Sequence, residues 1–328
     1  MLRRPRREQS VDSECDIVYS KFMRFTERLP PPLAKRARDR RTYLGKSAPR
    51  SSVGIRHCVY PVARIPFLLR GTFPVKLNQL RTLAYALTVG GLYAMAEDKL
   101  IDAEVDLTPS HSLLVPTLYG EFIRKLHTLF PPASRFWSYH DRYFSEYQMA
   151  EIEAIRGISR TALSEYCHIA QTKSAPVKLA LCGMAILSGR NHDVKKLIKS
   201  FDCCIIGCQF YDDVADWRED YLARRRSLVG ARIRNLMKSV GGGPLRRRLP
   251  EIEKVVHSSD IIESMLEESG RWLARAEESV KGVECQEWTR FLHSLAGRIS
   301  DTVRNVVSLK VNMLFNNSTA HKENYHGV

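Results

Sequence analysis

Helical periodicity is the feature of this sequence that most restricts how the chain can fold. From Val75 onward, apolar side chains recur at steps of three and four residues, which places them on one face of a helix. The sequence has no run of alternating apolar and polar residues typical of strands, and no long internal repeat stands out. We therefore expect an all-α protein, built as a single helical bundle.

Proline and glycine residues mark where the expected helices end. The helical patterns cover residues 77–106, 112–130, 133–172, 173–188, 191–226, 250–280 and 286–315. This division leaves three segments: a basic leader at 1–55, a helical domain at 56–316 and a polar tail at 317–328. The leader is rich in proline, arginine and serine, so we expect it to be disordered or loosely attached.

The net charge of +15 is concentrated in the leader, because residues 1–50 hold 14 Lys and Arg against 6 Asp and Glu. Such a leader could dock on an acidic membrane surface, but it shows no signal-peptide pattern. The longest run without charge, Thr82 to Ala96, has 15 residues and is too short to span a bilayer. Eight cysteines without a Cys-x-x-Cys pair indicate reduced thiols. These features favour a cytoplasmic protein that is at most peripheral to membranes.

Four aspartates follow an apolar run in the segment QFYDDVADWREDY at residues 209–221. On a helix, Asp212, Asp216 and Asp220 would stack along one face, and Asp213 would lie at its edge. Carboxylates at this spacing repel one another unless cations lie between them, and their oxygens suit Mg²⁺. A solvated helix face would explain such a cluster if it stood alone.

A second acidic cluster occurs far away in the sequence, in GLYAMAEDKLIDAEVDL at residues 91–107. Asp98 and Asp102 are again four residues apart, and both follow an apolar run. Two helices that carry the same pattern near their C-terminal ends can face each other across a bundle and hold metal ions between them. The pair of clusters therefore predicts a magnesium site more specifically than either cluster does.

Both clusters resemble the aspartate motifs of the class I isoprenoid synthase superfamily, which includes terpene synthases, trans-prenyltransferases and squalene and phytoene synthases. DKLID at 98–102 is similar to the first motif, and QFYDDVADWRED at 209–220 is similar to the second. FWSYHDRYFSEYQMAE at 136–151 and IAQTKSAPVK at 169–178 extend the resemblance, which covers roughly residues 60–315. It implies a helical bundle with a central cavity that binds a trio of Mg²⁺ ions and a prenyl diphosphate.

The resemblance also implies roles for individual residues. The expected catalytic residues are Asp98, Asp102, Asp212 and Asp216, and the expected metal ligands are these four with Asp213 and Asp220. The expected diphosphate-binding residues are Lys173, Arg218, Arg224, Arg225 and Arg226. The expected cavity-lining residues are Tyr93, Phe136, His140, Tyr143, Tyr147 and Gln209. Aromatic rings at such positions would shelter a carbocation, although the same stripe would also serve as ordinary core.

The expected reaction is the Mg²⁺-assisted ionisation of a linear prenyl diphosphate, with release of diphosphate. Chain-elongating prenyltransferases normally carry a Gly-Gly-Lys-Arg segment and an arginine pair after the first motif, whereas this chain has no arginine between Asp102 and Arg124. The sequence therefore favours a terpene synthase that forms a hydrocarbon or an alcohol. The alternative is a prenyltransferase, through head-to-head coupling of the squalene or phytoene type or, less favoured, through chain elongation. A non-catalytic partner subunit is a further alternative.

Residues 221–250 hold nine Lys and Arg and no acid, which raises the alternative of nucleic-acid binding. No recognisable nucleic-acid-binding motif accompanies that charge, and the aspartates would oppose it, so we expect no nucleic-acid partner. The expected partner is a prenyl diphosphate whose chain length the sequence leaves open, and a homodimer is compatible with the sequence.

Overall fold

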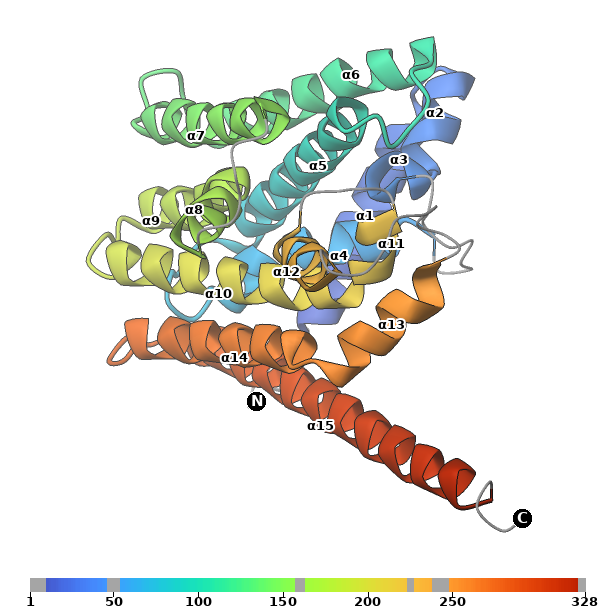
Figure 1. The fold of residues 1–328 in the computed structure, drawn as a ribbon. Helices are drawn as coiled ribbons and strands as arrows, with labels where there is room; N and C mark the ends of the chain where they lie inside the picture. The colour runs from blue at the N-terminus through green and yellow to red at the C-terminus, as the bar shows by residue number, and fades with distance from the viewer. Residues whose placement is uncertain (1–9, 46–53, 157–162, 223–226, 238–247, 324–328) are drawn as a thin grey trace, which may run out of the picture. The chain divides into compact units, whose positions relative to one another are not determined.

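The structure is a computed structural model that describes residues 10–45, 54–156, 163–222, 227–237 and 248–323. Within these ranges the chain forms fifteen α-helices and one short 3₁₀ helix, and no strand occurs in them (Figure 1). The prediction of an all-α protein is confirmed. None of the described helices combines the length and the apolar character needed to cross a membrane.

The chain divides into two compact units, and the helical domain expected over 56–316 is shared between them. The first unit consists of Met1–Gly157, Thr172–Ile198 and Gly282–Trp288. The second unit consists of Ile158–Gln171, Lys199–Lys281 and Thr289–Val328.

Helix α5 is the central helix of the first unit, and most of its middle portion is buried. The helices of this unit are α1 (Val11–Glu27), α2 (Pro31–Arg38), α3 (Arg41–Leu44), α4 (Arg56–Leu68), α5 (Leu77–Ile101), α6 (Pro109–His127), α7 (Phe136–Arg156), η1 (Ala175–Lys178) and α9 (Leu179–Ser188). Helices α1, α3, α4, α6 and α9 all contact α5. Gly90 lets α6 approach closely, because a Cβ atom there would lie 2.9 Å from the ring of Phe122.

The leader is folded from residue 11 to residue 44, so the prediction of a disordered leader is wrong over this range. The physical reason is that its apolar residues also fall at helical spacing. The apolar side chains of α1 that are fully buried are Cys15, Val18 and Phe22. Helix α1 contacts α4 and α5, and the burial of these side chains outweighs the high charge and proline content that favour disorder.

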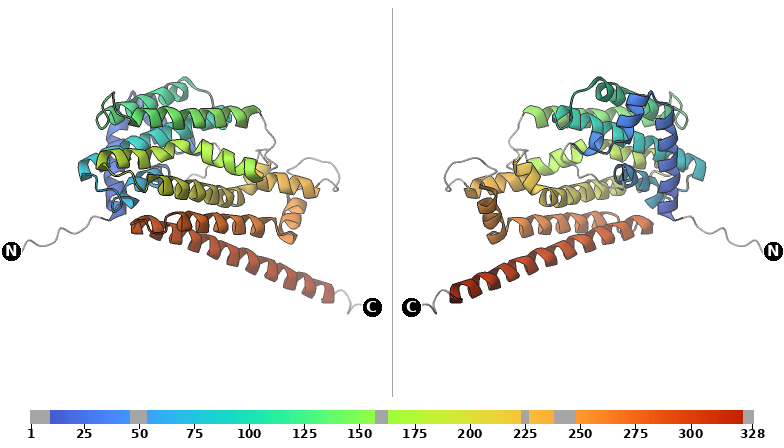
Figure 2. Two further views of the ribbon diagram at one scale, coloured as in Figure 1. Left: turned by 90° about the vertical axis from the view of Figure 1, so that its left-hand side faces the viewer. Right: turned by 90° about the vertical axis from the view of Figure 1, so that its right-hand side faces the viewer.

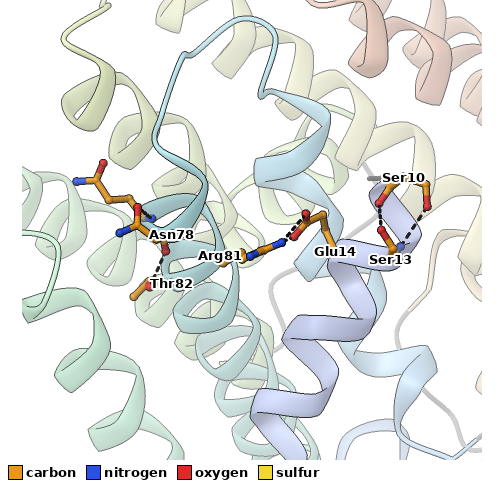
Figure 3. Close-up of polar contacts among 7 residues, drawn as sticks. Ser10, Ser13, Glu14, Asn78, Arg81 and Thr82 are labelled. Atoms are coloured by element: carbon orange, nitrogen blue, oxygen red, sulfur yellow. Dashed lines mark hydrogen bonds and ion pairs between the residues drawn. The ribbon is translucent and has the colours of Figure 1, made fainter. Parts of the chain in front are cut away.

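A buried ion pair also joins α1 to α5. The carboxylate of Glu14, which is 1% exposed, accepts hydrogen bonds from Nε and Nη2 of Arg81 at 2.7 and 2.9 Å (Figure 3). The same figure shows Ser10 capping the N-terminus of α1 by accepting a hydrogen bond from the backbone N–H of Ser13 at 3.2 Å. The leader therefore belongs to the core of the first unit.

The second unit contains the helices that follow α7, apart from η1 and α9. Its helices are α8 (Leu163–Lys173), α10 (Val194–Ala215), α11 (Trp217–Leu222), α12 (Leu228–Leu236), α13 (Leu249–Ser258), α14 (Ile261–Ser279) and α15 (Gln286–Glu323), of which α8, α10 and α15 each begin or end in the first unit. The buried hydroxyl of Ser269 on α14 donates to the backbone carbonyl of Gly207 on α10 at 2.6 Å. Helix α15 runs alongside α14 in both views of Figure 2, and Lys310 pairs with Glu263 there.

Candidate functional site

The first aspartate cluster lies at the C-terminal end of α5, which ends at Ile101 and not near residue 106 as the sequence pattern suggested. Asp98 is in the last turn and Asp102 is the C-cap. The next residue, Ala103, has a left-handed φ of 54°. The amides of Ala103 and Glu104 then bond back to Leu100 and Lys99, which closes the helix in a Schellman motif. A left-handed alanine costs about 1 kcal/mol, so the backbone is strained directly beside the cluster.

Asp98 does not stand free but pairs with Lys173. The Nζ atom of Lys173 lies 2.9 Å from Oδ1 of Asp98 and 3.1 Å from Oε2 of Glu151, whose side chain is 6% exposed. Burial acts to lower the pKa of Lys173, but the two carboxylates overcome it and raise that pKa. Burial likewise acts to raise the pKa of Asp98, but Lys173 and Lys99 overcome it and lower that pKa. Asp98 is therefore ionised and Lys173 is charged.

Asp102 has the opposite electrostatic balance. Its pKa is raised by partial loss of hydration and by the nearby carboxylate of Asp98, while Lys173 and Lys99 act against this shift. The two aspartates thus repel each other, and a cation that binds both would relieve the repulsion.

The second aspartate cluster spans a break in the helix. The sequence pattern predicted one helix to about residue 226, but α10 ends at Ala215 and α11 begins at Trp217. Backbone hydrogen bonds from Asp216 to Asp212 at 2.9 Å and from Asp220 to Asp216 at 3.0 Å cross the break. The four-residue register that aligns these aspartates therefore survives the interruption.

Asp213 is built into the protein scaffold. It is 5% exposed, and one carboxylate oxygen accepts from the side-chain amide of Gln209 at 2.9 Å. The other oxygen accepts from the backbone N–H of Leu228, the first residue of α12, at 3.1 Å. Burial raises the pKa of Asp213, and these hydrogen bonds limit the rise. Asp213 thus ties the end of α10 to the start of α12.

Asp212 differs from its neighbour Asp213 in exposure. Its side chain is exposed, but the surrounding protein removes part of its hydration. This effect and the carboxylates of Asp216 and Asp213 raise its pKa from 3.8 to about 6, while Arg298 acts in the opposite direction. An exposed carboxylate whose charge is disfavoured by neighbouring acids is suited to receive a cation.

The donors of both clusters fit Mg²⁺ by their chemistry. In the described part of the chain, no three Asp, Glu, His or Cys side chains are already gathered as a metal-binding group. Mg²⁺ typically binds through one or two carboxylates and completes its coordination with water and substrate phosphates. Asp98 with Asp102, and Asp212 with Asp216, each offer such a pair of hard oxygen ligands.

The predicted diphosphate-binding residues fall into three groups. Lys173 lies at the first cluster, as described. Arg218 is paired with Glu253 of α13, with Nε 2.7 Å from Oε1. The residues Arg224, Arg225 and Arg226 lie outside the described residues.

The predicted cavity-lining aromatic residues are tightly packed within the first unit. Phe136 is fully buried and stacks on Phe130, with ring centroids 3.8 Å apart, and His140 stacks on Phe144 at 4.5 Å. Tyr143 is buried next to Cys182. The packing of Phe136 and Tyr143 is that of ordinary core, which was the alternative interpretation of this stripe.

Two acidic residues next to the first cluster, Glu97 and Glu151, were not among the predicted site residues. The hydroxyls of Tyr93 and Tyr147 both donate to Glu97, at 2.8 and 3.0 Å, and Glu151 holds Lys173. Glu151 ends the segment FWSYHDRYFSEYQMAE, but nothing in that segment marks it as the partner of Lys173. Pairing across helices is not readable from helical spacing alone.

Comparison with known proteins identifies the fold. No protein-family model matches the chain, and no curated protein sequence matches it. Among solved structures, heptaprenyl diphosphate synthase from Staphylococcus aureus is similar with a TM-score of 0.70 and 15% identity, over 90% of this chain and 99% of that chain. Geranylgeranyl pyrophosphate synthase from Corynebacterium glutamicum follows with a TM-score of 0.65 and 13% identity, over 89% and 92% of the two chains.

A third similar structure is octaprenyl pyrophosphate synthase from Helicobacter pylori, with a TM-score of 0.62 and 14% identity, over 87% of this chain and 99% of that chain. The protein therefore has an all-α fold that is similar to the fold of these prenyl diphosphate synthases. The structural resemblance expected from the two aspartate motifs is confirmed.

Proposed function

We propose that the protein is a Mg²⁺-dependent prenyltransferase that acts on an allylic prenyl diphosphate. The proposal rests on the similarity of fold to three solved structures, which extends over about nine-tenths of the chain. These structures are named as synthases of heptaprenyl, geranylgeranyl and octaprenyl diphosphates. The sequence favoured a terpene synthase, with a prenyltransferase as the alternative. The fold comparison supports that alternative better.

The two aspartate clusters would supply the metal ligands. Asp98 and Asp102 in the first unit, and Asp212 and Asp216 in the second, would hold the ions, because the charges within each pair repel and Asp213 is already bound by Gln209 and Leu228. Bound Mg²⁺ supplies neutralisation of the leaving diphosphate. Asp213 keeps α10 and α12 joined and is not among the ligands.

Lys173 would supply positive charge to the diphosphate at the first cluster. Its ammonium group has three donors, and at present it contacts Asp98 and Glu151. Glu151 keeps the lysine protonated and fixes its position, so one donor can turn to a phosphate oxygen while that pairing persists. Lys173 is thus a binding residue, and Glu151 is a positioning residue.

A terpene synthase is the second candidate, and a specific observation favours it. Chain elongation requires cations for a second diphosphate, that of isopentenyl diphosphate. After Asp102 the first arginine is Arg124, and its guanidinium is bound to the carboxylate of Glu121. An enzyme that uses a single diphosphate substrate would not need further cations.

A substrate panel separates the candidates. The protein is incubated with Mg²⁺ and farnesyl or geranylgeranyl diphosphate, with and without isopentenyl diphosphate, and the products are identified by mass spectrometry. A longer diphosphate formed only with isopentenyl diphosphate shows elongation, and a coupled C30 or C40 product shows head-to-head transfer. A hydrocarbon or alcohol formed from one substrate shows a terpene synthase and refutes the prenyltransferase.

Matched variants test the metal ligands in the same assay. Asp98→Asn and Asp212→Asn remove one carboxylate charge each and should abolish turnover. Asp260→Asn, at an exposed aspartate outside both clusters, is the control and should retain it. Full activity of the two cluster variants would refute the assignment of the ligands.

A further inference from the structure

A pocket of about 510 Å³ lies in the first unit between α1, α5 and α6. Its lining includes Thr82 and Tyr85 of α5 and Glu121 of α6. Thr82 is 16 residues before Asp98 on the same helix, which corresponds to about 24 Å along the helix axis. The pocket is therefore separate from the first aspartate cluster.

Basic side chains dominate the lining of this pocket. Lys21 and Arg24 come from α1, Arg28 is the C-cap residue of α1, and Lys125 comes from α6. Positions 21, 24 and 28 are three and four residues apart, so these three side chains share one face of α1. In the described ranges of the chain, no carboxylate forms an ion pair with any of the four.

The two acids of the pocket do not balance this charge. Glu121 accepts a hydrogen bond from the hydroxyl of Tyr85 at 2.8 Å and is already neutralised by Arg124. Glu27 is exposed at the rim. The pocket therefore contains four basic groups and only one carboxylate, that of Glu27, which is not already paired with a cation.

The effect of the excess charge is visible at Lys21, which is half-buried. Its pKa is lowered by burial and then by the positive charges of Arg81, Lys125 and Arg24, while Glu14 acts in the opposite direction. Arg81 is held by Glu14 (Figure 3), so that carboxylate is not available to the pocket. A bound anion would relieve the remaining repulsion among the basic groups.

We propose that this pocket between α1, α5 and α6 is a second anion site that binds a diphosphate group. Two arginines offer paired N–H donors that match phosphate oxygens, and two lysines add point charges. A diphosphate carries more negative charge than a carboxylate or a single phosphate, so it neutralises more of the positive charge of the four basic groups. The volume of the pocket lies within the range of small-molecule sites and leaves room for an organic substituent.

Isothermal titration calorimetry on the full chain tests this site. The titrants are inorganic diphosphate, inorganic phosphate and farnesyl diphosphate, all in EDTA, so that metal-dependent binding at the aspartates is absent. Wild-type protein should bind diphosphate more tightly than phosphate. The double variant Arg24→Ala/Arg28→Ala should weaken diphosphate binding at least about tenfold, because it removes two charge-assisted contacts. Both side chains are exposed at the rim, so the variant should keep its thermal midpoint.

A further variant locates the binding. Arg70→Ala removes an exposed arginine of the same unit outside the pocket and should leave the affinity unchanged. Diphosphate binding that is absent, that persists in the double variant, or that weakens equally in Arg70→Ala overturns the proposal.

The titrants also identify the source of the diphosphate, whatever the activity of the protein. Farnesyl diphosphate that binds no more tightly than inorganic diphosphate supports a site for the free anion. Tighter binding of farnesyl diphosphate supports a site for the head group of a larger molecule. Neither result depends on turnover, so failure of the proposed enzymatic function would leave this test intact.

Discussion

Two adjacent aspartates should change stability in opposite directions when each is replaced. Asp213 is buried and both of its oxygens accept hydrogen bonds from the protein. Asp212 is exposed, but partial loss of hydration and the carboxylates of Asp216 and Asp213 disfavour its charged form. We therefore expect Asp213→Ala to destabilise the protein and Asp212→Asn to stabilise it in the absence of metal.

The loss of stability expected for Asp213→Ala follows from the two hydrogen bonds that Asp213 accepts. A hydrogen bond to a charged group contributes about 1.5–3 kcal/mol, and a buried donor left without an acceptor costs about 1–3 kcal/mol. The backbone N–H of Leu228 would be such a donor. We expect Asp213→Ala to lower the free energy of unfolding by about 3–4 kcal/mol, and Asp213→Asn by less, because an amide oxygen remains.

The magnitude for Asp212 comes from its pKa, which the fold raises from 3.8 to about 6. A shift of about two units corresponds to about 3 kcal/mol if it is unscreened. The side chain is exposed, and solvent screening reduces the effect to about 1 kcal/mol. The folded protein binds the proton more tightly than the unfolded chain, so this group costs stability as pH rises from about 4 to above 6. Asp212→Asn should therefore gain about 1 kcal/mol over wild type at pH 7.5 and nothing at pH 4.

Urea unfolding in EDTA, followed by far-UV circular dichroism at both pH values, measures these differences. Asp260→Asn is the control for replacing an exposed aspartate elsewhere. A loss of stability in Asp212→Asn at pH 7.5, or no loss in Asp213→Ala, would refute the division of these residues into a metal ligand and a scaffold residue.

Three further predictions concern the first unit, and each is checked by the midpoint of thermal unfolding. Glu14→Gln weakens the buried pair with Arg81 and should cost about 1–3 kcal/mol, which a detached leader would not show. Gly90→Ala places a Cβ atom 2.9 Å from the ring of Phe122 and should lower the free energy of unfolding by about 1–3 kcal/mol. No loss of stability would mean that α5 and α6 can move apart easily. Ala103→Gly relieves the strain of the left-handed φ of 54° and should raise the free energy of unfolding by about 1 kcal/mol. A loss of stability would show that the backbone at this position is not strained.

Helical spacing was sufficient to predict the fold class and the place of both aspartate clusters near helix ends. It failed where two properties of one segment compete. In α1 the charges and prolines of the leader indicated disorder, but Cys15, Val18 and Phe22 share a buried face. Composition averages over a segment, whereas folding depends on which side chains point inward.

Spacing also could not rank the four aspartates of the second cluster. Asp212 and Asp213 are neighbours of the same type, and only the structure shows that Gln209 and the amide of Leu228 bind Asp213. Leu228 is 15 residues further along the chain and approaches only when α12 has packed. The partner of Lys173 was out of reach for the same reason, because Glu151 is on a different helix.

The most direct test of the proposed metal site is the release of inorganic diphosphate from farnesyl diphosphate in the presence of isopentenyl diphosphate. We predict release that requires Mg²⁺, stops in EDTA and falls about 100-fold or more in Asp98→Asn, because a metal ligand at the leaving group is lost. The control Asp260→Asn should release diphosphate at the wild-type rate. No release with Mg²⁺, or release that continues unchanged in EDTA, would contradict the assignment of the aspartates as the metal site of a prenyl diphosphate-converting enzyme.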